Sequence, residues 1–223
     1  MRAFAEIYAL AAERKGGEAA LEALITRPGD PAALRALSDD RWLSAFSKRV
    51  FQAGFNWSVI EKKWPDFEIA FEGFQPGRWA MASDEDLDRL LQDRRIVRHA
   101  TKIRSVFENA VFLTDLAKEE GRPAGQVFAD WPDEDFVGLL DLLKRRGSRL
   151  GGGTAQYTLR FLGKPAFVLS RDVTAALIRE GVIEKPATSK GALAKVQAAF
   201  NAWSDESGRS LSEISQVLAR STG

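Results

Sequence analysis

The chain of 223 residues contains no cysteine and a single histidine, His99. Without cysteine it forms no disulfide, and thiolate metal sites, iron–sulfur clusters and cysteine nucleophiles are excluded. One histidine also excludes histidine-rich zinc sites and any motif that needs two histidines. We therefore expect neither a metal nor a cofactor, and any hydrolytic chemistry has to work without them.

Long apolar runs are missing as well. The longest uncharged apolar stretch near the start is Ile7 to Ala12, which is too short to span a membrane and lacks the pattern of a secretory signal. The composition, 45% hydrophobic and 28% charged, excludes disordered and collagen-like proteins. We expect a globular, cytoplasmic protein that acts as a monomer and has no membrane partner.

The net charge is only +1, from 32 Lys plus Arg against 31 Asp plus Glu, but the signs segregate along the chain. The stretch Arg94 to Arg104 holds five cations and no acid, and Asp141 to Arg171 holds seven cations and one acid. Two basic islands of this kind allow one positive face to meet a polyanion such as DNA. The alternative is that these charges scatter around helices and cancel in space.

Apolar residues recur at the spacing of amphipathic helices along most of the chain. Two such sets are Trp42, Leu43, Phe46, Val50 and Phe51, and Ile103, Val106, Phe107, Ala110 and Val111. Helix starts are indicated by Ser83–Asp86, by Ser210–Glu213 and by Pro65, Pro76 and Pro132. Only residues 166–169 have any strand character. We predict an all-α protein of about ten to twelve short helices.

Glycine and proline suggest the domain organisation. Residues 1–37 are rich in alanine and interrupted by Gly16-Gly17 and by residues 28–31, so they read as an N-terminal helical extension. Residues 38–223 are predicted to form the main domain. It would include a C-terminal helical pair, around residues 190–204 and 210–221, after a hinge at residues 186–189.

The segment from residue 139 to 159 has the pattern of a helix-hairpin-helix. A leucine-rich helix ends at Gly147, a turn carries Leu150, and a second helix starts at Thr154. Between them lie the glycines Gly151, Gly152 and Gly153. Glycines let backbone N–H groups approach a phosphate closely, and the next helix adds the positive end of its dipole. Counter-charge would come from Lys144, Arg145, Arg146 and Arg149. The alternative is a flexible turn with solvated cations.

Three blocks together resemble one known family. They are Gln52-Ala53-Gly54-Phe55-Asn56-Trp57, then Leu91-Gln92-Asp93 with Ile96-Val97-Arg98-His99 and Lys102-Ile103, then residues 144–157. The bacterial DNA-3-methyladenine glycosylase I family has Q-A-G-L-S-W, Q-D, I-I-R-H-x-x-K-I and a K-R-G hairpin that leads to G-T-T and Tyr, in this order and at similar spacing. The resemblance covers roughly residues 40–172.

The resemblance implies a helix-hairpin-helix DNA glycosylase bundle and a role in base-excision repair. Such hydrolases evert a damaged base from double-stranded DNA and cut its N-glycosidic bond. Trp57 is then expected in the base pocket, with polar contacts from Gln52 and Asn56. The hairpin residues Gly151, Gly152, Gly153 and Thr154 would hold a phosphate, with Lys144 and Arg149 beside them. A base alkylated at N3 is cationic and already leaves easily, so little acid or nucleophile assistance is needed.

The chain departs from this family in three places. Eight residues before the pocket Trp the family has a Glu that contacts the base, and this chain has Arg49 there. The family's zinc ligands, two Cys and two His, have no equivalent. The family's N-terminal aromatic pocket residues have no clear match, although Trp42 or Tyr8 could replace them. We therefore expect a divergent member of this family, for which the resemblance is a better guide to the fold than to the substrate.

Catalytic candidates are few. In the wider helix-hairpin-helix superfamily an Asp follows the hairpin, and Asp172 is the carboxylate in the corresponding stretch; a shifted register would place Ser170 there instead. The alternative for Asp172 is a cap for a helix at residues 173–179. His99 is expected to be a hydrogen-bonded structural residue near a helix start.

These observations favour a DNA glycosylase acting on an alkylated, 3-methyladenine-like base at the bacterial nucleoid. Arg49 raises an alternative, a glycosylase-like protein that has lost catalysis and binds damaged or bent DNA. A helical protein-interaction module is a third hypothesis, favoured if the basic islands lie on different faces.

Overall fold

The computed structural model describes residues 1–222, and the regular secondary structure in this range is helical. It contains fourteen α-helices and two short 3-10 helices, and the described residues form no strand. The all-α prediction is confirmed, with slightly more helices than expected. The shortest, α2 (Glu18–Glu22), α3 (Pro31–Arg35) and α6 (Pro76–Trp79), have about one turn each. One turn is too short for the periodicity of apolar residues to reveal.

The chain divides into two compact units, which we call the central and the terminal unit. The central unit comprises Pro31–Asp130 and Leu140–Thr158. The terminal unit comprises Met1–Asp30, Trp131–Leu139 and the residues from Leu159 onward. The organisation predicted from the sequence, an extension at residues 1–37 followed by one domain, stays a prediction.

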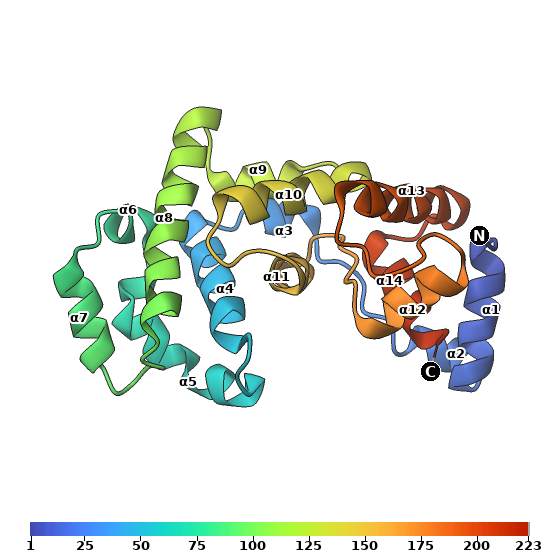
Figure 1. Cartoon of the computed structure of the whole chain (residues 1–223), viewed down its shortest axis with the longest axis horizontal. Helices are drawn as coiled ribbons and strands as arrows, with labels where there is room; N and C mark the ends of the chain where they lie inside the picture. The colour runs from blue at the N-terminus through green and yellow to red at the C-terminus, as the bar shows by residue number, and fades with distance from the viewer. Residues whose placement is uncertain (223) are drawn as a thin grey trace. The chain divides into compact units, whose positions relative to one another are not determined.

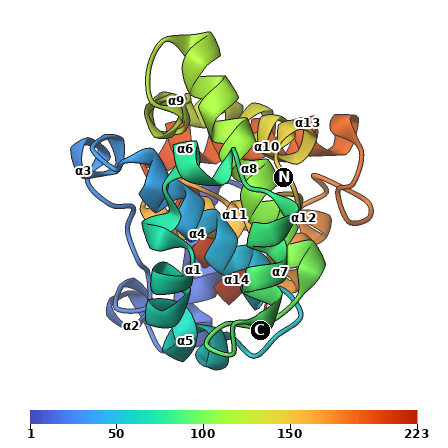
Figure 2. The same cartoon turned by 90° about the vertical axis from the view of Figure 1, so that its left-hand side faces the viewer.

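The central unit is assembled around its longest helix, α8 (Ala100–Glu120). Helices α4, α6, α7 and α9 all pack against α8, and Figures 1 and 2 show α4 and α8 side by side. The remaining bounds are α4 (Asp39–Gln52), α5 (Trp57–Ala70), α7 (Asp84–Gln92), α9 (Ala124–Asp130) and the 3-10 helix η1 (Glu72–Phe74). The site described below belongs entirely to this unit.

Aromatic side chains fill the core of the central unit. On α4, Trp42 and Phe46 are fully buried, and both rings contact Phe128 of α9, at centroid distances of 5.2 and 5.9 Å. Gly125 permits this packing, because a Cβ on it would lie 2.3 Å from Nε1 of Trp42. Trp42 is therefore a core residue, and the expectation that it could join a base pocket is wrong.

Helix α5 also corrects a predicted boundary. Pro65 was expected to begin a helix, but it lies inside α5, which runs unbroken from Trp57 to Ala70. A proline inside a helix removes one N–H, here the partner of the Glu61 carbonyl. Pro65 and Glu61 are both exposed, so water can replace the missing donor. The apolar face of α5, with Ile60, Trp64 and Phe67 buried, maintains the helix across it.

The terminal unit brings the two ends of the chain together. Arg2 forms an ion pair with Glu180 at 2.7 Å, and the N–H of Phe4 donates to the Glu206 carboxylate at 2.9 Å. Its helices include α1 (Phe4–Lys15), α12 (Arg171–Arg179), α13 (Lys190–Ser207) and α14 (Leu211–Arg220), which Figure 1 shows grouped together. The 3-10 helix η2 (Asp133–Asp135) packs against α13. Among residues 1–222, no helix is both long enough and apolar enough to cross a membrane.

The start of α7 yields a pH-dependent prediction. Asp86 accepts the N–H of Ser83 at 3.1 Å in a capping box and also binds Arg78, which holds the pKa of this carboxyl well below its ordinary value. Asp86→Asn is expected to lower the free energy of unfolding by about 1 kcal/mol at pH 7. Because the native pKa is depressed, the carboxylate stabilises the fold above pH 3.8 and loses its effect as the pH falls below it.

Urea denaturation at pH 7 and at pH 3 measures this effect. The difference between wild type and Asp86→Asn should shrink at pH 3. An equal difference at both pH values would show that the Asp86 charge contributes nothing to stability.

Candidate functional site

The turn between α4 and α5 places Trp57 at the surface. Helix α4 ends at Gln52, and Gly54 takes a left-handed conformation with φ +76°. Asn56 then caps α5, because its Oδ1 accepts the N–H of Ser58 at 3.0 Å. Trp57 is the first residue of α5 and is 43% exposed. Asn56, predicted as a base contact, thus has a local structural task that the Q-A-G-x-x-W pattern did not reveal.

The side chains of Arg49 and Tyr157 contact the Trp57 indole. The guanidinium carbon of Arg49 lies 5.0 Å from the ring centroid, and the Tyr157 ring meets it edge-on at 5.6 Å and 89°. Arg49 also donates from Nη1 to Oε1 of the buried Gln52. Burial lowers the pKa of Arg49, and the charge of Glu61 acts in the opposite direction. The structure therefore brings Arg49, Gln52 and Trp57 together and adds Tyr157.

Lys102 links two of the sequence motifs physically. Its Nζ donates to the carbonyl oxygens of Phe51 at 3.1 Å and Ala53 at 2.6 Å, and lies 4.4 Å from the centroid of the Phe55 ring. Burial lowers the Lys102 pKa, and the charge of Arg149 lowers it further. From the sequence, Lys102 was only one residue of the R-H-x-x-K-I block and one cation of the stretch Arg94 to Arg104. Its position on α8 makes it the residue that holds the turn before Trp57.

The hairpin follows the predicted course closely. Helix α10 (Phe136–Arg146) ends one residue before Gly147, and α11 (Gly153–Leu162) begins one residue before Thr154. Gly147 is required by space, since a Cβ there would lie 2.7 Å from the Leu143 carbonyl oxygen. Leu150 is fully buried and anchors the turn in the core.

Asn109 of α8 fixes the hairpin backbone. This fully buried side chain donates from Nδ2 to the Ser148 carbonyl at 3.1 Å and accepts the Ser148 N–H on Oδ1 at 2.7 Å. The next residue, Arg149, takes a left-handed conformation with φ +60°, which is unusual for a residue with a side chain. Sequence reasoning missed Asn109. The one feature of the sequence that could have indicated its role is that an amide side chain stands on the apolar face of a predicted helix.

The three glycines of the turn have different roles. Gly152 is left-handed, with φ +55°, whereas Gly151 and Gly153 have ordinary backbone angles and room for a Cβ. The first N–H groups of α11 have no helical partners by construction, so they point out of the helix start. Gly151 and Gly152 leave the approach to these groups without side chains.

Carboxylates neutralise some of the basic side chains beside the hairpin turn. Arg145 binds Asp141 at 2.8 Å, and Arg146 binds Glu119 at a normal ion-pair distance on the surface. Lys144 and Arg149 are both exposed, and neither forms an ion pair with a carboxylate within residues 1–222. The charge available for a phosphate therefore comes from Lys144 and Arg149 more than from the two neighbouring arginines.

One pocket joins the α4 end to the hairpin. Its volume is about 350 Å³, and its lining consists of Val50, Ala53, Arg149, Gly151 and Thr154. Val50 and Ala53 flank Gln52, while Thr154 precedes Tyr157 by about one helical turn. Trp57 is not among the lining residues, and its exposure of 43% shows that the indole is not sealed into the core.

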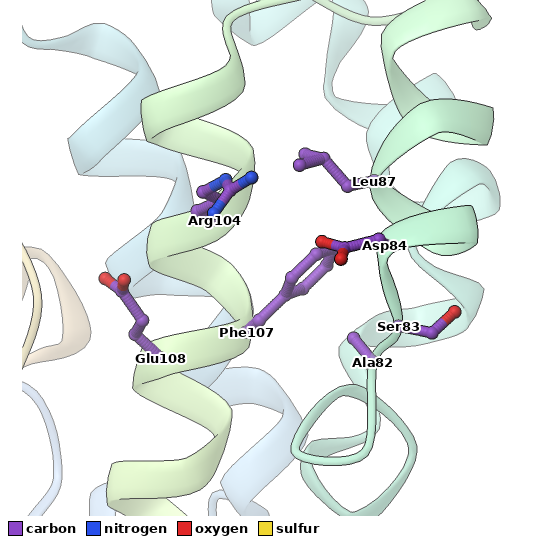
Figure 3. A pocket seen from close by; sticks show the side chains of 7 residues that line it. All are labelled: Ala82, Ser83, Asp84, Leu87, Arg104, Phe107 and Glu108. Carbon is purple, nitrogen blue, oxygen red and sulfur yellow. The ribbon is translucent and has the colours of Figure 1, made fainter.

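A second pocket, of about 380 Å³, lies between α7 and α8. Its lining consists of Ala82, Ser83, Asp84, Leu87, Arg104, Phe107 and Glu108. Figure 3 shows the Phe107 ring reaching from α8 toward the start of α7, with Arg104 and Glu108 on successive turns. Both signs of charge are present, and Ser83 serves the α7 cap. No predicted site residue lies here.

The other predicted residues lie outside this group. His99 is the N-cap of α8, where Nδ1 accepts the Lys102 N–H at 3.4 Å, so its structural role is confirmed. Asp172 is exposed in the first turn of α12, which begins at Arg171, and Ser170 rather than Asp172 is the N-cap. The Tyr8 hydroxyl donates to Glu22 at 2.7 Å in the terminal unit.

The zinc site that the resemblance implies does not fit this chain. Its donor set needs cysteine, which is absent, and the single histidine uses Nδ1 to cap α8. Among residues 1–222, no three His, Asp or Glu side chains form a group that could hold a metal ion.

Comparison with known proteins finds a likeness to one family. Residues 35–130 match the sequence profile of the methyladenine glycosylases. Over 98 residues the chain is 39% identical to DNA-3-methyladenine glycosylase 1 of Escherichia coli strain K12. Over this segment the chain resembles the methyladenine glycosylase family.

The matched segment, residues 35–130, contains Arg49, Gln52, Trp57, Lys102 and Asn109, and the hairpin lies beyond it. The match covers 40% of this chain and 52% of the Escherichia coli protein. A second relative, DNA-3-methyladenine glycosylase of Haemophilus influenzae, is 29% identical over 80 residues, or 36% of this chain and 40% of its own. The chain thus spans about half the length of these curated relatives, or less.

Solved structures support the same fold. A Glu-to-Gln variant of 3-methyladenine DNA glycosylase I from Staphylococcus aureus is 22% identical, with a TM-score of 0.51, covering 65% of this chain and 85% of that one. A second structure of the Staphylococcus aureus protein, described for its recognition of 3-methyladenine, is 21% identical with the same TM-score and covers 69% and 89%. The predicted glycosylase-like helical bundle is confirmed as a fold.

Proposed function

We propose that this protein is a DNA glycosylase of base-excision repair. It would hydrolyse the N-glycosidic bond of an alkylated base, similar in size and shape to 3-methyladenine, everted from double-stranded DNA. The observation that carries this proposal is the pocket lined by both Ala53 and Gly151. It puts the segment that holds Trp57 next to the backbone suited to bind phosphate. We further propose a monomer that acts on DNA in the bacterial cytoplasm.

The aromatic pair provides the base site in this proposal. A base that leaves the helix loses its stacking, and the exposed Trp57 indole, supported edge-on by Tyr157, replaces it. Gln52 is buried and its Oε1 is bound by Arg49, so its polar contact with the base stays a prediction. Phe55, also exposed and held over Lys102, is an apolar side chain of the kind that inserts where a base has left the stack.

The hairpin provides the contacts with the DNA backbone in this proposal. The N–H groups at the start of α11, near Gly152, Gly153 and Thr154, bind a phosphate oxygen, and Lys144 and Arg149 add counter-charge. Such contacts fix the position of the duplex without reading its sequence. Asp172 belongs to the terminal unit, so its role as the catalytic carboxylate, which would stabilise the cationic sugar as the bond breaks, stays a prediction from the resemblance alone. Asp172→Asn should then slow base release without weakening DNA binding.

A direct assay tests the proposed function. The full chain is incubated with methylated duplex DNA and with duplexes that carry single damaged bases, and released free base is measured by chromatography. Release of any damaged base, with an abasic site left behind, is the expected result. Arg49 over Trp57 favours the alternative of a binding protein without catalysis. Salt-sensitive binding to damaged duplex with no base released from the whole set would establish that alternative.

The phosphate site makes a separate prediction about salt. Lys144→Gln and Arg149→Gln are each expected to reduce by about one the slope of log affinity for duplex DNA against log salt. Fluorescence anisotropy at several salt concentrations measures the slope. Arg145→Gln is the matched control, since its charge is already paired with Asp141. Equal effects of all three variants would contradict a specific phosphate site at the hairpin.

A further inference from the structure

The most unusual feature of the proposed base site is a cation on the aromatic ring. The Arg49 guanidinium lies 5.0 Å from the Trp57 ring centroid and is anchored by its bond to Gln52. Arginine keeps its charge in proteins even when partly buried. A base that stacks against Trp57 therefore has a fixed positive charge as a close neighbour.

The surrounding charges do not reverse this sign. Glu61, whose charge acts on Arg49, is bound to Lys48, and its Oε1 lies 3.5 Å from Nε2 of Gln52. Two further cations near the turn are Lys102, beneath Phe55, and Arg149, whose charge acts on Lys102. Cations outnumber carboxylates among these groups. The charges of these named groups therefore sum to a positive value beside Trp57.

A positive site discriminates between two classes of damaged base. A base alkylated at a ring nitrogen, as in 3-methyladenine, is cationic while still attached to the sugar, so Arg49 repels it. An uncharged base is not repelled. When its bond to C1′ breaks, the bonding electron pair stays on the base nitrogen and negative charge develops there. A guanidinium close to that charge stabilises the transition state more than the ground state.

We propose that Arg49 makes this protein selective for an uncharged damaged base, whose departure as an anion it stabilises, over a cationic alkylated base. This inference rests on the proposed function and specifies its substrate class. The bond from C1′ to the base nitrogen breaks, the oxygen of water bonds to C1′, and a proton of that water ends on the departing base. The products are a neutral free base and an abasic sugar, so no oxidant, metal or further reactant is needed.

The test compares two substrates and a charge series. One duplex is methylated DNA, which yields 3-methyladenine, and the other carries 1,N6-ethenoadenine, an uncharged adduct of similar size. Single-turnover rates of base release are measured for wild type, Arg49→Lys, Arg49→Gln and Arg49→Glu. Lys62→Glu, at an exposed position on α5, is the control for net charge.

Wild type is expected to release the uncharged base at least about tenfold faster than 3-methyladenine. Arg49→Lys should keep this order, Arg49→Gln should reduce the ratio, and Arg49→Glu should reverse it. Lys62→Glu should leave the ratio unchanged. Thermal melting shows whether each variant is folded, and Arg49→Lys and Arg49→Gln keep the test decisive if Arg49→Glu does not fold.

Two results would overturn the inference while leaving the glycosylase activity in place. One is faster release of 3-methyladenine by wild type, and the other is a ratio that stays the same across the Arg49 series. If wild type releases neither base but Arg49→Glu releases 3-methyladenine, the inference also fails and the native protein is a binding protein. If no variant releases any base although all bind the duplex, the proposed function itself fails.

Discussion

Trp57→Ala is expected to release damaged base from duplex DNA about a hundredfold more slowly than wild type. Stacking of one base on an aromatic side chain contributes about 1–3 kcal/mol, and 3 kcal/mol corresponds to a factor of about one hundred in rate. The indole is 43% exposed at the start of α5, and its removal also deprives Tyr157 of its ring contact. DNA affinity should fall only a few-fold, because the proposed phosphate contacts lie on the hairpin.

Single-turnover base release and fluorescence anisotropy measure these two quantities separately. Ile69→Ala is the matched control, because Ile69 is an apolar residue on the same helix that is 62% exposed. Trp57→Phe keeps a smaller ring and should fall between wild type and Trp57→Ala. A Trp57→Ala variant that still releases base at the wild-type rate would remove Trp57 from the base site. An equal loss of binding and release would indicate that the residue serves the fold instead.

Asn109→Ala is expected to lower the free energy of unfolding by about 2–4 kcal/mol and to weaken DNA binding about tenfold. The Asn109 side chain is fully buried and satisfies both backbone groups of Ser148. Without it, a donor and an acceptor at the start of the hairpin turn lose their partners. Arg149 follows directly in its left-handed conformation, so the turn that presents the phosphate site would no longer be held.

Urea denaturation and DNA titration at fixed salt give both numbers for Asn109→Ala. Glu108→Ala, at the exposed position next to it on α8, is the control and should change stability little. Asn109→Asp should not rescue the site, since a carboxylate cannot donate to the Ser148 carbonyl. Stability and affinity close to wild type in Asn109→Ala would show that the hairpin holds its shape without α8.

The hairpin was the part of the site most accessible from sequence. Gly147 is needed because a Cβ would meet the Leu143 carbonyl, and Gly152 because its φ is positive. Both constraints act within a few residues, so the glycines mark the turn before any tertiary contact is known. The helix ends at Arg146 and starts at Gly153, one residue from each predicted position. His99 could be predicted for the same reason, as a cap next to its own helix.

The base site was less accessible. Gln52, Arg49 and Trp57 are brought together by one turn and one helix, so their proximity follows from local spacing. Tyr157 contacts Trp57 from a segment a hundred residues later in the chain, and no local sequence pattern predicts this contact. Trp42 was expected as a possible replacement for an unmatched pocket residue, because its pattern marks a helix face but not how deeply that face is buried. Packing against Phe128 and Gly125 decided that it belongs to the core.

The amino-acid sequence alone determined the helical class, the hairpin with its side-chain-poor turn, and the absence of cysteine and metal-binding histidines. Periodicity, caps and glycines act over about one helical turn, and this range is short enough to be visible in the order of residues. Only the tertiary structure decided that Lys102 holds a turn 49 and 51 residues earlier and that Asn109 holds Ser148 39 residues later. Hydrogen bonds over such separations form only when folding brings the two segments together. In the central unit, this is decided by the packing of its helices on α8.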